Sequence, residues 1–438
     1  MKPIDRNILR LALPSIVSNI TVPLLGLCDV AVMGHVGGAT HIGAIAVGSM
    51  IFNVMYWLFG FLRMSTSGLT AQAYGAGAMV ETQRLLRHTL KMALAWGMAI
   101  IVLQLPLQWL TFWLMQADGI VAELCTPYFH IVVWGAPAVL GLYGLSGWLV
   151  GMQNTRIPMM IAIGQNVVNI ALSLTLVVGF GMGIHGVAIG TLTAQWAGFL
   201  GGLLLSKGWL SKNRHLAVDT HPEATEKLRQ EGPKHGTLNI DIFLRTLCLV
   251  SVNLYFTSAG SAQGPLILAA NTLLMQFFMV YSYITDGFAS AGEALSGRYT
   301  GAADRPMLSA TVRHLFAWGL AVALLFTLVY LLAGPAILSL LTSDGEVVLT
   351  AMDYLPWAVL IPLSGMAAFV WDGIFIGTTR SRAMLTSCAA ATACFFALWL
   401  LLRSQLHNHA LWLALLVYLA VRGLVQTLDW TIHHGQQP

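Results

Sequence analysis

Charged residues are scarce in this chain. Asp, Glu, Lys and Arg together make up 9% of the 438 residues, whereas 57% are hydrophobic. A soluble globular domain has about a quarter of its residues charged. So few charges could not cover the surface of a chain of this length in water. The composition therefore excludes a soluble enzyme and predicts a membrane protein with many spans.

Cysteine is also rare, and its five residues all lie in apolar stretches. They form no Cys-x-x-Cys pair and no Cys/His spacing typical of zinc sites, so we interpret them as small core residues. We accordingly expect no metal and no cofactor. The net charge of +4 is small, and the basic residues are spread along the chain by topology rather than gathered into a nucleic-acid-binding patch.

Twelve apolar runs are long enough to cross a bilayer, whose core of about 30 Å requires roughly 20 residues per helix. Their length and uniform apolar character argue against membrane β-strands. The predicted fold class is an all-α integral membrane protein with twelve transmembrane helices. The predicted spans are 8–33, 42–75, 88–114, 124–151, 157–181, 184–206, 241–262, 266–297, 312–341, 347–377, 382–402 and 408–430.

Basic residues alternate from loop to loop. Lys2, Arg6 and Arg10 precede the first span, whereas the loop at 34–41 has no Lys or Arg. The pattern continues to the end of the chain, with Arg403 as the exception. Because loops rich in Lys and Arg stay in the cytoplasm, both termini are expected there.

The two halves of the sequence are similar at a nearly constant offset. Gly147 and Gly151 in span 4 correspond to Gly373 and Gly377 in span 10, 226 residues later. Six spans return the chain to the same side, so the halves are parallel repeats with a pseudo-two-fold axis along the membrane normal. We predict two six-helix lobes, typical of alternating-access transporters, which could work as a monomer. The divisions are the N-lobe 1–206, a cytoplasmic linker 207–240 and the C-lobe 241–438.

Four acidic residues lie well inside apolar sequence. They are Asp29, Asp286, Glu293 and Asp372. Each costs about 2.5–3.5 kcal/mol at mid-membrane, so each is a candidate functional group. Structural alternatives remain open: Asp29 could meet interfacial water, Glu293 could pair with Arg298, and Asp372 could pair with Arg380.

Asp29 occupies the outer half of the first span, which contains Pro14 and Pro23. Each proline removes a backbone hydrogen bond and is a candidate bend point, or hinge. A carboxyl group in a cavity that is alternately wet and dry changes its affinity for protons with conformation. That coupling is what a proton-driven transporter needs.

Other polar residues of the spans are candidates for a substrate or cation cavity. Asn166, Asn169 and Ser173 share one face of span 5, where such side chains commonly bond between helices. Arg63 either reaches the cytoplasmic face or is a counter-ion within the first lobe. Asp286 and Glu293, seven residues apart, are expected on one face of span 8.

Five segments together resemble the multidrug and toxic compound extrusion (MATE) family, most closely its DinF-type bacterial branch. They are 13–35, 61–72, 286–293, 372–380 and 408–415. The resemblance extends over essentially the whole chain. It implies two six-helix lobes in a bacterial inner membrane and cation-coupled export of organic, often cationic, compounds.

The resemblance also assigns roles in the N-lobe. Asp29 matches a first-helix carboxylate whose protonation is linked to bending at the proline matched by Pro14. Asn169 and Thr191 match polar residues of the same cavity. Ser173 stands where this branch usually has Asp, which weakens a two-carboxylate proton site and leaves more of the coupling to Asp29.

In the C-lobe the resemblance matches Asp286, Glu293 and Asp372 to acidic residues that other branches link to sodium. We expect H+ to be the coupling ion, with Na+ as the open alternative.

Three other kinds of membrane protein compete with this interpretation. A lipid-linked oligosaccharide flippase would line its cavity with several basic residues, and the sequence offers only Arg63 as a candidate. A major-facilitator carrier would carry a Gly…Asp-Arg…Gly-Arg pattern, which is absent from residues 74–87. A membrane enzyme would need clustered His, Ser or carboxylate residues at one face, whereas the 13 His are scattered.

Overall fold

The computed structural model describes residues 2–34, 38–115, 119–213, 223, 226 and 235–435, and every regular element among them is helical. Most of the predicted linker 207–240 lies outside these residues, although α9 continues to Lys212 and α11 begins at His235. In chain order the helices are α1 (Pro3–Gly34), α2 (Gly38–Leu58), α3 (Phe61–Gly75), α4 (Met79–Val102), α5 (Gln104–Met115), α6 (Gly119–Val132), η1 (Val133–Gly135), α7 (Ala136–Gly151), α8 (Arg156–Leu174), η2 (Thr175–Gly179), α9 (Gly183–Lys212), α11 (His235–Ser261), α12 (Pro265–Gly301), α13 (Arg305–Leu341), α14 (Gly345–Gly377), α15 (Ser381–Leu406) and α16 (Asn408–Gly435).

The number of helices agrees with the predicted spans. Eleven helical stretches of the described chain are long and apolar enough to cross a membrane. Helix α1, which has 32 residues and is not among these eleven, brings the number to twelve. Several spans are interrupted: α2 and α3 form one span, and α6, η1 and α7 form another, whereas α4 alone forms the span Met79–Val102 and α5 follows it as a separate helix. The all-α fold class is confirmed.

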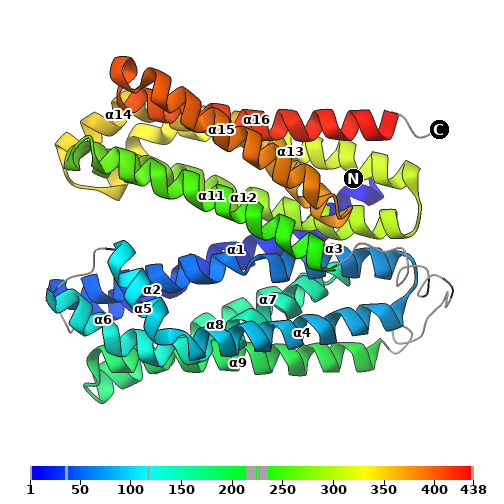
Figure 1. Cartoon of the computed structure of the whole chain (residues 1–438), viewed down its shortest axis with the longest axis horizontal. Helices are drawn as coiled ribbons and strands as arrows, with labels where there is room; N and C mark the ends of the chain where they lie inside the picture. Colours follow the sequence, from blue (N-terminus) through cyan, green and yellow to red (C-terminus); the bar gives the residue numbers. More distant parts are fainter. Residues whose placement is uncertain are drawn as a thin grey trace. The chain divides into compact units, whose positions relative to one another are not determined.

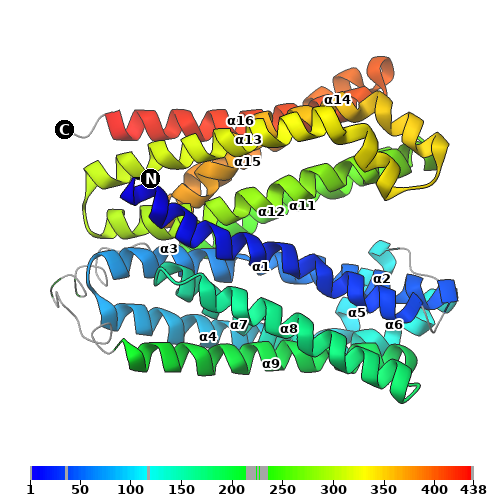
Figure 2. The same ribbon diagram turned by 180° about the vertical axis from the view of Figure 1, so that it is seen from behind.

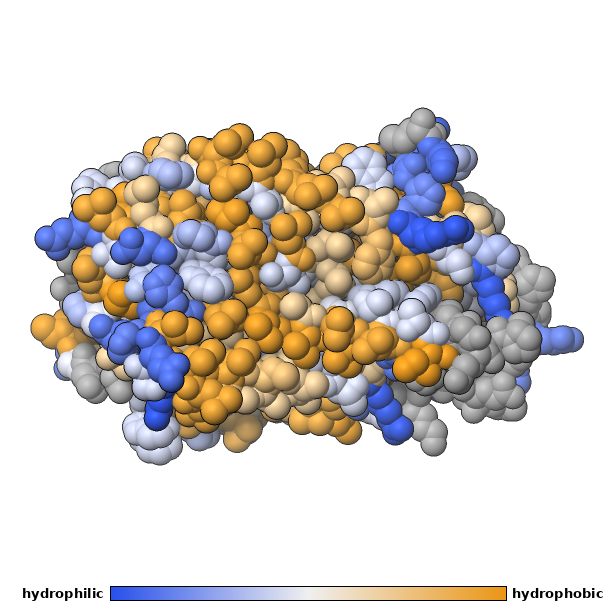
Figure 3. Space-filling model, turned by 90° about the horizontal axis from the view of Figure 1, so that it is seen from above, coloured by the Kyte–Doolittle hydropathy of each residue, from blue (hydrophilic) through white to orange (hydrophobic). Residues whose placement is uncertain are grey.

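Large apolar side chains remain on the outside of these helices. Leu340 is 86% exposed and Leu332 is 74% exposed, and apolar side chains cover much of the visible face (Figure 3). A soluble monomer rarely exposes large contiguous apolar patches. In a bilayer these side chains face lipid, so the free-energy cost of exposing apolar surface to water does not arise.

Two compact units make up the chain. The N-terminal unit is Val17–Gly232, and the C-terminal unit is Pro233–Pro438 together with Met1–Ile16. Residues 1–16, which the predicted division assigns to the N-lobe, thus group with the C-terminal unit. In the N-terminal unit α3 packs along α7 and α8 along α9; in the C-terminal unit α12 packs along α14 and α15 along α16 (Figures 1 and 2).

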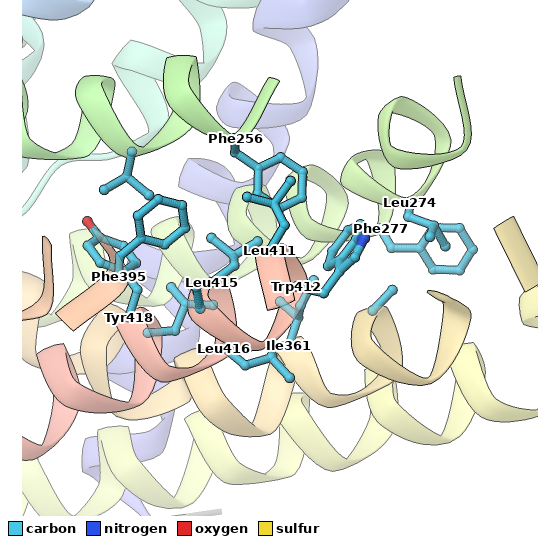
Figure 4. Close-up of a cluster of buried hydrophobic side chains, with 14 of the residues drawn as sticks. Phe256, Leu274, Phe277, Ile361, Phe395, Leu411, Trp412, Leu415, Leu416 and Tyr418 are labelled. Carbon is cyan, nitrogen blue, oxygen red and sulfur yellow. The ribbon is translucent and has the colours of Figure 1, made fainter. Parts of the chain in front are cut away.

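Aromatic residues form much of the core of the C-terminal unit (Figure 4). Trp412 is fully buried, and its ring lies edge-on against that of Phe256. Its indole N–H donates to Asn271 Oδ1 at 2.9 Å, and the Tyr281 hydroxyl donates to the carbonyl of Pro362 at 3.0 Å. Each buried polar tip therefore has a partner, as buried Tyr and Trp require.

The internal repeat is visible in the packing of paired glycines. A Cβ on Gly147 would lie 3.0 Å from the carbonyl carbon of Arg63, and a Cβ on Gly373 would lie 2.7 Å from that of Ala289. Both the glycines and their partners are 226 residues apart. The same close backbone approach therefore joins α3 to α7 and α12 to α14, which confirms the predicted repeat.

Replacing either glycine of this pair with alanine is expected to destabilise the protein. Gly373→Ala and Gly147→Ala each force two helix backbones apart, at a cost of about 1–3 kcal/mol. The matched control is Gly164→Ala on α8, because a Cβ there meets nothing within 4 Å and improves helix propensity by up to about 1 kcal/mol. Thermal unfolding in detergent measures all three, and equal melting temperatures would contradict the close approach.

Candidate functional site

Asp29 lies at the centre of a buried polar cluster in the N-terminal unit. It is 1% exposed. Its Oδ2 accepts a hydrogen bond from Thr191 Oγ1 at 2.9 Å, and the same hydroxyl accepts from Asn169 Nδ2 at 3.1 Å. Ser173 also lies next to the carboxyl group. The structure thus brings four predicted residues from α1, α8 and α9 into one site.

Helix spacing and a glycine position these groups. Asn169 and Ser173 are four residues apart on α8, so they occupy one face, and both are fully buried. On α9, Gly190 precedes Thr191, and a Cβ at Gly190 would lie 3.1 Å from the backbone nitrogen of Ser173. The small residue lets α9 come close enough for the Thr191 hydroxyl to bridge Asn169 and Asp29.

The cluster is rich in acceptors. Among the described residues, Asp29 Oδ1, Asn169 Oδ1 and Ser173 Oγ are buried without a hydrogen-bond partner. An ionised carboxylate and an amide oxygen only accept hydrogen bonds, whereas a protonated carboxyl group also donates one. The Ser173 hydroxyl has one hydrogen to donate and can pair only one of the other two oxygens. Because buried polar groups are normally paired, this arrangement favours a proton on Asp29.

Tyr128 of α6 belongs to the same neighbourhood, and sequence reasoning did not select it. It is 2% exposed, its hydroxyl lies 3.2 Å from Ser49 Oγ, and it is close to both Asp29 and Thr191. No spacing in the sequence connects a tyrosine on α6 with an acid on α1. Only the packing of the helices reveals it.

The third polar residue of α8 contacts the backbone of α1. Asn166 Nδ2 donates to the carbonyl oxygen of Thr21 at 2.7 Å. Thr21 lies between the two predicted hinges, Pro14 and Pro23, and both prolines lie within the single continuous helix α1. The outer part of α1 is thus held to α8 and α9 at Thr21 and again at Asp29.

Asp372 forms a different kind of cluster in the C-terminal unit. Its Oδ2 accepts from Arg245 and, at 2.5 Å, from Arg422 Nη2, and its Oδ1 accepts from Gln426 Nε2 at 2.9 Å. The pairing with Arg380 considered from the sequence was wrong, because Arg380 pairs with Asp429 at 3.0 Å. Both oxygens of Asp372 are therefore already occupied by donors of the protein itself.

Arg245 and Arg422 were missed by sequence reasoning. Each is 4% exposed, so Arg63 is not the only basic candidate inside the membrane. The available signal was position: Arg245 lies in the apolar run 241–262 and Arg422 in 408–430. Basic residues within spans mark buried polar networks as reliably as acidic ones do.

The remaining candidates lie apart from these two clusters. Glu293 is 1% exposed, whereas Asp286, seven residues earlier on α12, is exposed and accepts from Ser282 Oγ at 3.4 Å. Their common helix face therefore does not give them a common environment. Arg63 is partly buried near the start of α3. In the described part of the chain, no group of three or more His, Cys, Asp or Glu side chains is arranged to hold a metal ion.

Twelve apolar helices in two repeated units, each with a buried carboxyl group, are typical of helical membrane transporters. The MatE family model matches residues 14–198 and 242–398. The chain belongs to this family of membrane transporters, so the predicted family and its two-lobed twelve-helix fold are confirmed.

Two relatives illustrate the range of similarity. The chain is 41% identical over 429 residues to DNA damage-inducible protein F of Escherichia coli K12, covering 98% of this chain and 92% of that protein. It is 24% identical to the probable multidrug resistance protein NorM of Photorhabdus laumondii, covering 86% and 83%. The chain is thus similar to the DinF type of transporter.

Solved structures share the fold. A crystal structure of a MATE protein in the bent conformation superimposes with a TM-score of 0.85 at 18% identity, covering 99% of this chain and 96% of that one. An outward-facing multidrug resistance MATE transporter gives a TM-score of 0.81 at 20% identity, with the same coverage. Both similarities concern the fold alone.

Proposed function

We propose that this protein is a proton-coupled antiporter that exports organic, often cationic, drugs or toxic compounds from a bacterial cell by alternating access. The observation that carries the proposal is the buried Asp29 carboxyl group, whose Oδ1 lacks a hydrogen-bond partner, as do the neighbouring Asn169 Oδ1 and Ser173 Oγ. The names of relatives such as NorM support drugs as the class of substrate. The protein works as a monomer in the inner membrane, with both termini in the cytoplasm.

The surroundings of Asp29 and Asp372 favour H+ over Na+ as the coupling ion. Asp29 is bonded to neutral groups, which tolerate either protonation state of a carboxyl group. Asp372 is bonded to Arg245 and Arg422. A sodium ion at Asp372 would meet two positive charges at close range, and like charges repel strongly in a medium of low dielectric constant.

Transport follows from competition between the cationic substrate and a proton for Asp29. A cationic substrate binds from the cytoplasm while Asp29 is ionised. In the outward-facing state a proton reaches Asp29 and removes its negative charge, α1 bends at Pro14, and the substrate leaves. Release of the proton to the cytoplasm restores the ionised carboxylate for the next cycle.

Efflux from proteoliposomes tests the coupling ion. With a fluorescent cationic dye as the probe, an imposed gradient of one pH unit is expected to sustain a dye gradient of up to about tenfold per exchanged proton, since one pH unit supplies about 1.4 kcal/mol per proton. A sodium gradient at equal pH on both sides is expected to add nothing. Transport that follows the sodium gradient and ignores the pH gradient would refute proton coupling.

The structure does not favour the flippase alternative. A flippase cavity needs basic groups that are free to meet a phosphate, and both newly found arginines bind Asp372 and are almost fully buried.

A further inference from the structure

The first four turns of α1 pack within the C-terminal unit along one face of the helix. Ile8, Leu11, Ala12 and Ser15 are buried, whereas Arg6 and Arg10 are exposed. Residues spaced three and four apart share a face, so this is a continuous buried stripe. The N-terminal turns of α1 lie beside α13 in both views (Figures 1 and 2).

A polar contact fastens the beginning of this stripe. Asp5 Oδ1 lies 2.7 Å from His314 Nδ1 and accepts from Trp318 Nε1 at 3.1 Å. His314 and Trp318 are four residues apart on α13, and the Trp318 ring stacks on Phe288 of α12. The hydrogen bond with His314 holds the pKa of Asp5 below its ordinary value, so the contact favours the ionised carboxylate as the acceptor.

A close backbone approach fastens the end of the stripe. A Cβ on Gly287 of α12 would lie 3.0 Å from the backbone nitrogen of Ile16 and 3.1 Å from the carbonyl oxygen of Ala12. Absence of a side chain at Gly287 therefore lets α1 lie directly on α12. Residues 3–16 are fixed at Asp5 and again at Ala12 and Ile16, about two to three turns further along the helix.

The rest of α1 belongs to the other unit. From Val17 onward the helix groups with the N-terminal unit, where Asn166 holds Thr21 and Thr191 holds Asp29. The division between Ile16 and Val17 comes two residues after Pro14. One helix is thus anchored in both units, and Pro14, which removes a backbone hydrogen bond, lies next to the division.

We propose that Asp5, His314 and Trp318 are positioning residues that fix the first segment of α1 on α12 and α13 throughout the transport cycle. While this segment is held in place, protonation of Asp29 bends α1 near Pro14. Without the anchor, α1 shifts as a whole, and protonation of Asp29 no longer bends it. The second part of this inference rests on the proposed function, whereas the anchor itself does not.

A buried thiol introduced by Ser15→Cys reports on the anchor without requiring transport. This substitution is nearly isosteric and lies on the buried stripe, in a full-length protein whose five native cysteines are replaced by serine or alanine. Maleimide labelling of the thiol is expected to be roughly tenfold faster when Asp5→Ala or His314→Ala is added, because loss of a hydrogen bond to a charged group weakens docking by that order. Asp5→Glu should restore protection. Asp353→Ala, at an exposed carboxylate of α14, is the control and should leave the rate unchanged.

A reversible cross-link then tests whether the anchor persists through the cycle. Cysteines introduced at positions 5 and 314 are joined by a short bifunctional thiosulfonate reagent and released with dithiothreitol. Because the two substitutions remove the contact between Asp5 and His314, dye efflux is expected to be faster in the cross-linked protein than after release, since the reagent then keeps the segment docked. Efflux that stops on cross-linking and returns on release overturns the proposal, as does labelling of the Ser15→Cys protein that both alanine variants leave unchanged. If labelling responds as expected but a pH gradient drives no efflux, the anchor holds and proton-coupled export is refuted.

Discussion

Asp29→Asn is expected to lower dye efflux driven by a pH gradient by roughly a hundredfold, at the upper end of typical coupling free energies of 1–3 kcal/mol. The amide keeps an oxygen that can accept from Thr191, so the packing of α1 on α8 and α9 is retained. It can no longer gain or lose a proton. The pH gradient can therefore no longer drive the conformational cycle through this residue, although the fold is retained.

Dye binding supplies the matching equilibrium measurement. In the wild type, binding of a cationic dye is expected to weaken as the pH falls, because a proton on Asp29 removes the charge that attracts the dye. The variant should bind the dye with one affinity at every pH. Asp353→Asn, at an exposed carboxylate of α14, is the control for a carboxylate lost elsewhere. An Asp29→Asn protein that exports dye at the wild-type rate would show that Asp29 is not the coupling site.

Much of this fold was predictable because the bilayer imposes simple rules. Hydrophobic runs of about 20 residues must be helical to satisfy their backbone groups, so the spans could be located from composition. The repeat was predictable because paired glycines such as Gly147 and Gly373 serve the same close backbone contact in both halves. The helix breaks between α2 and α3 and between α4 and α5 were not predicted, since neither depends on hydropathy.

The sites were only partly predictable because they join residues distant in sequence. The acids could be selected one at a time from the cost of burying a charge. Their partners could not: Tyr128 reaches Asp29 through the packing of α6, and the carboxylate of Asp372 meets an arginine from α11 and another from α16. The grouping of residues 1–16 with the C-terminal unit likewise has no signature in hydropathy.

Asp372→Asn is expected to destabilise the protein by about 3–5 kcal/mol, the usual cost of removing one member of a buried ion pair. Arg245 and Arg422 are each 4% exposed, so neither can turn to water when its partner is lost. Thermal unfolding in detergent should show a melting temperature roughly 10 °C lower. The control is Asp429→Asn, whose pair with Arg380 is partly exposed and is worth about 1 kcal/mol or less.

Removing a guanidinium together with the carboxylate should recover stability. The double variant Asp372→Asn/Arg422→Gln restores the original net charge of the cluster, so it is expected to melt well above Asp372→Asn alone. The pair can be assigned an interaction energy only from the complete double-mutant cycle, because neighbouring substitutions are not additive. If the double variant is no more stable than the single one, the two side chains do not act as a pair.

The same measurement separates an ion pair from a sodium site. A ligand that binds only the folded protein raises its melting temperature, so a sodium site at Asp372 would make the wild type more stable in sodium than in choline chloride. With Arg245 and Arg422 occupying the carboxylate, we expect no such difference. Stabilisation by sodium that disappears in Asp372→Asn would show that the guanidinium groups leave this carboxylate. The coupling ion would then be sodium bound at Asp372 rather than a proton bound at Asp29.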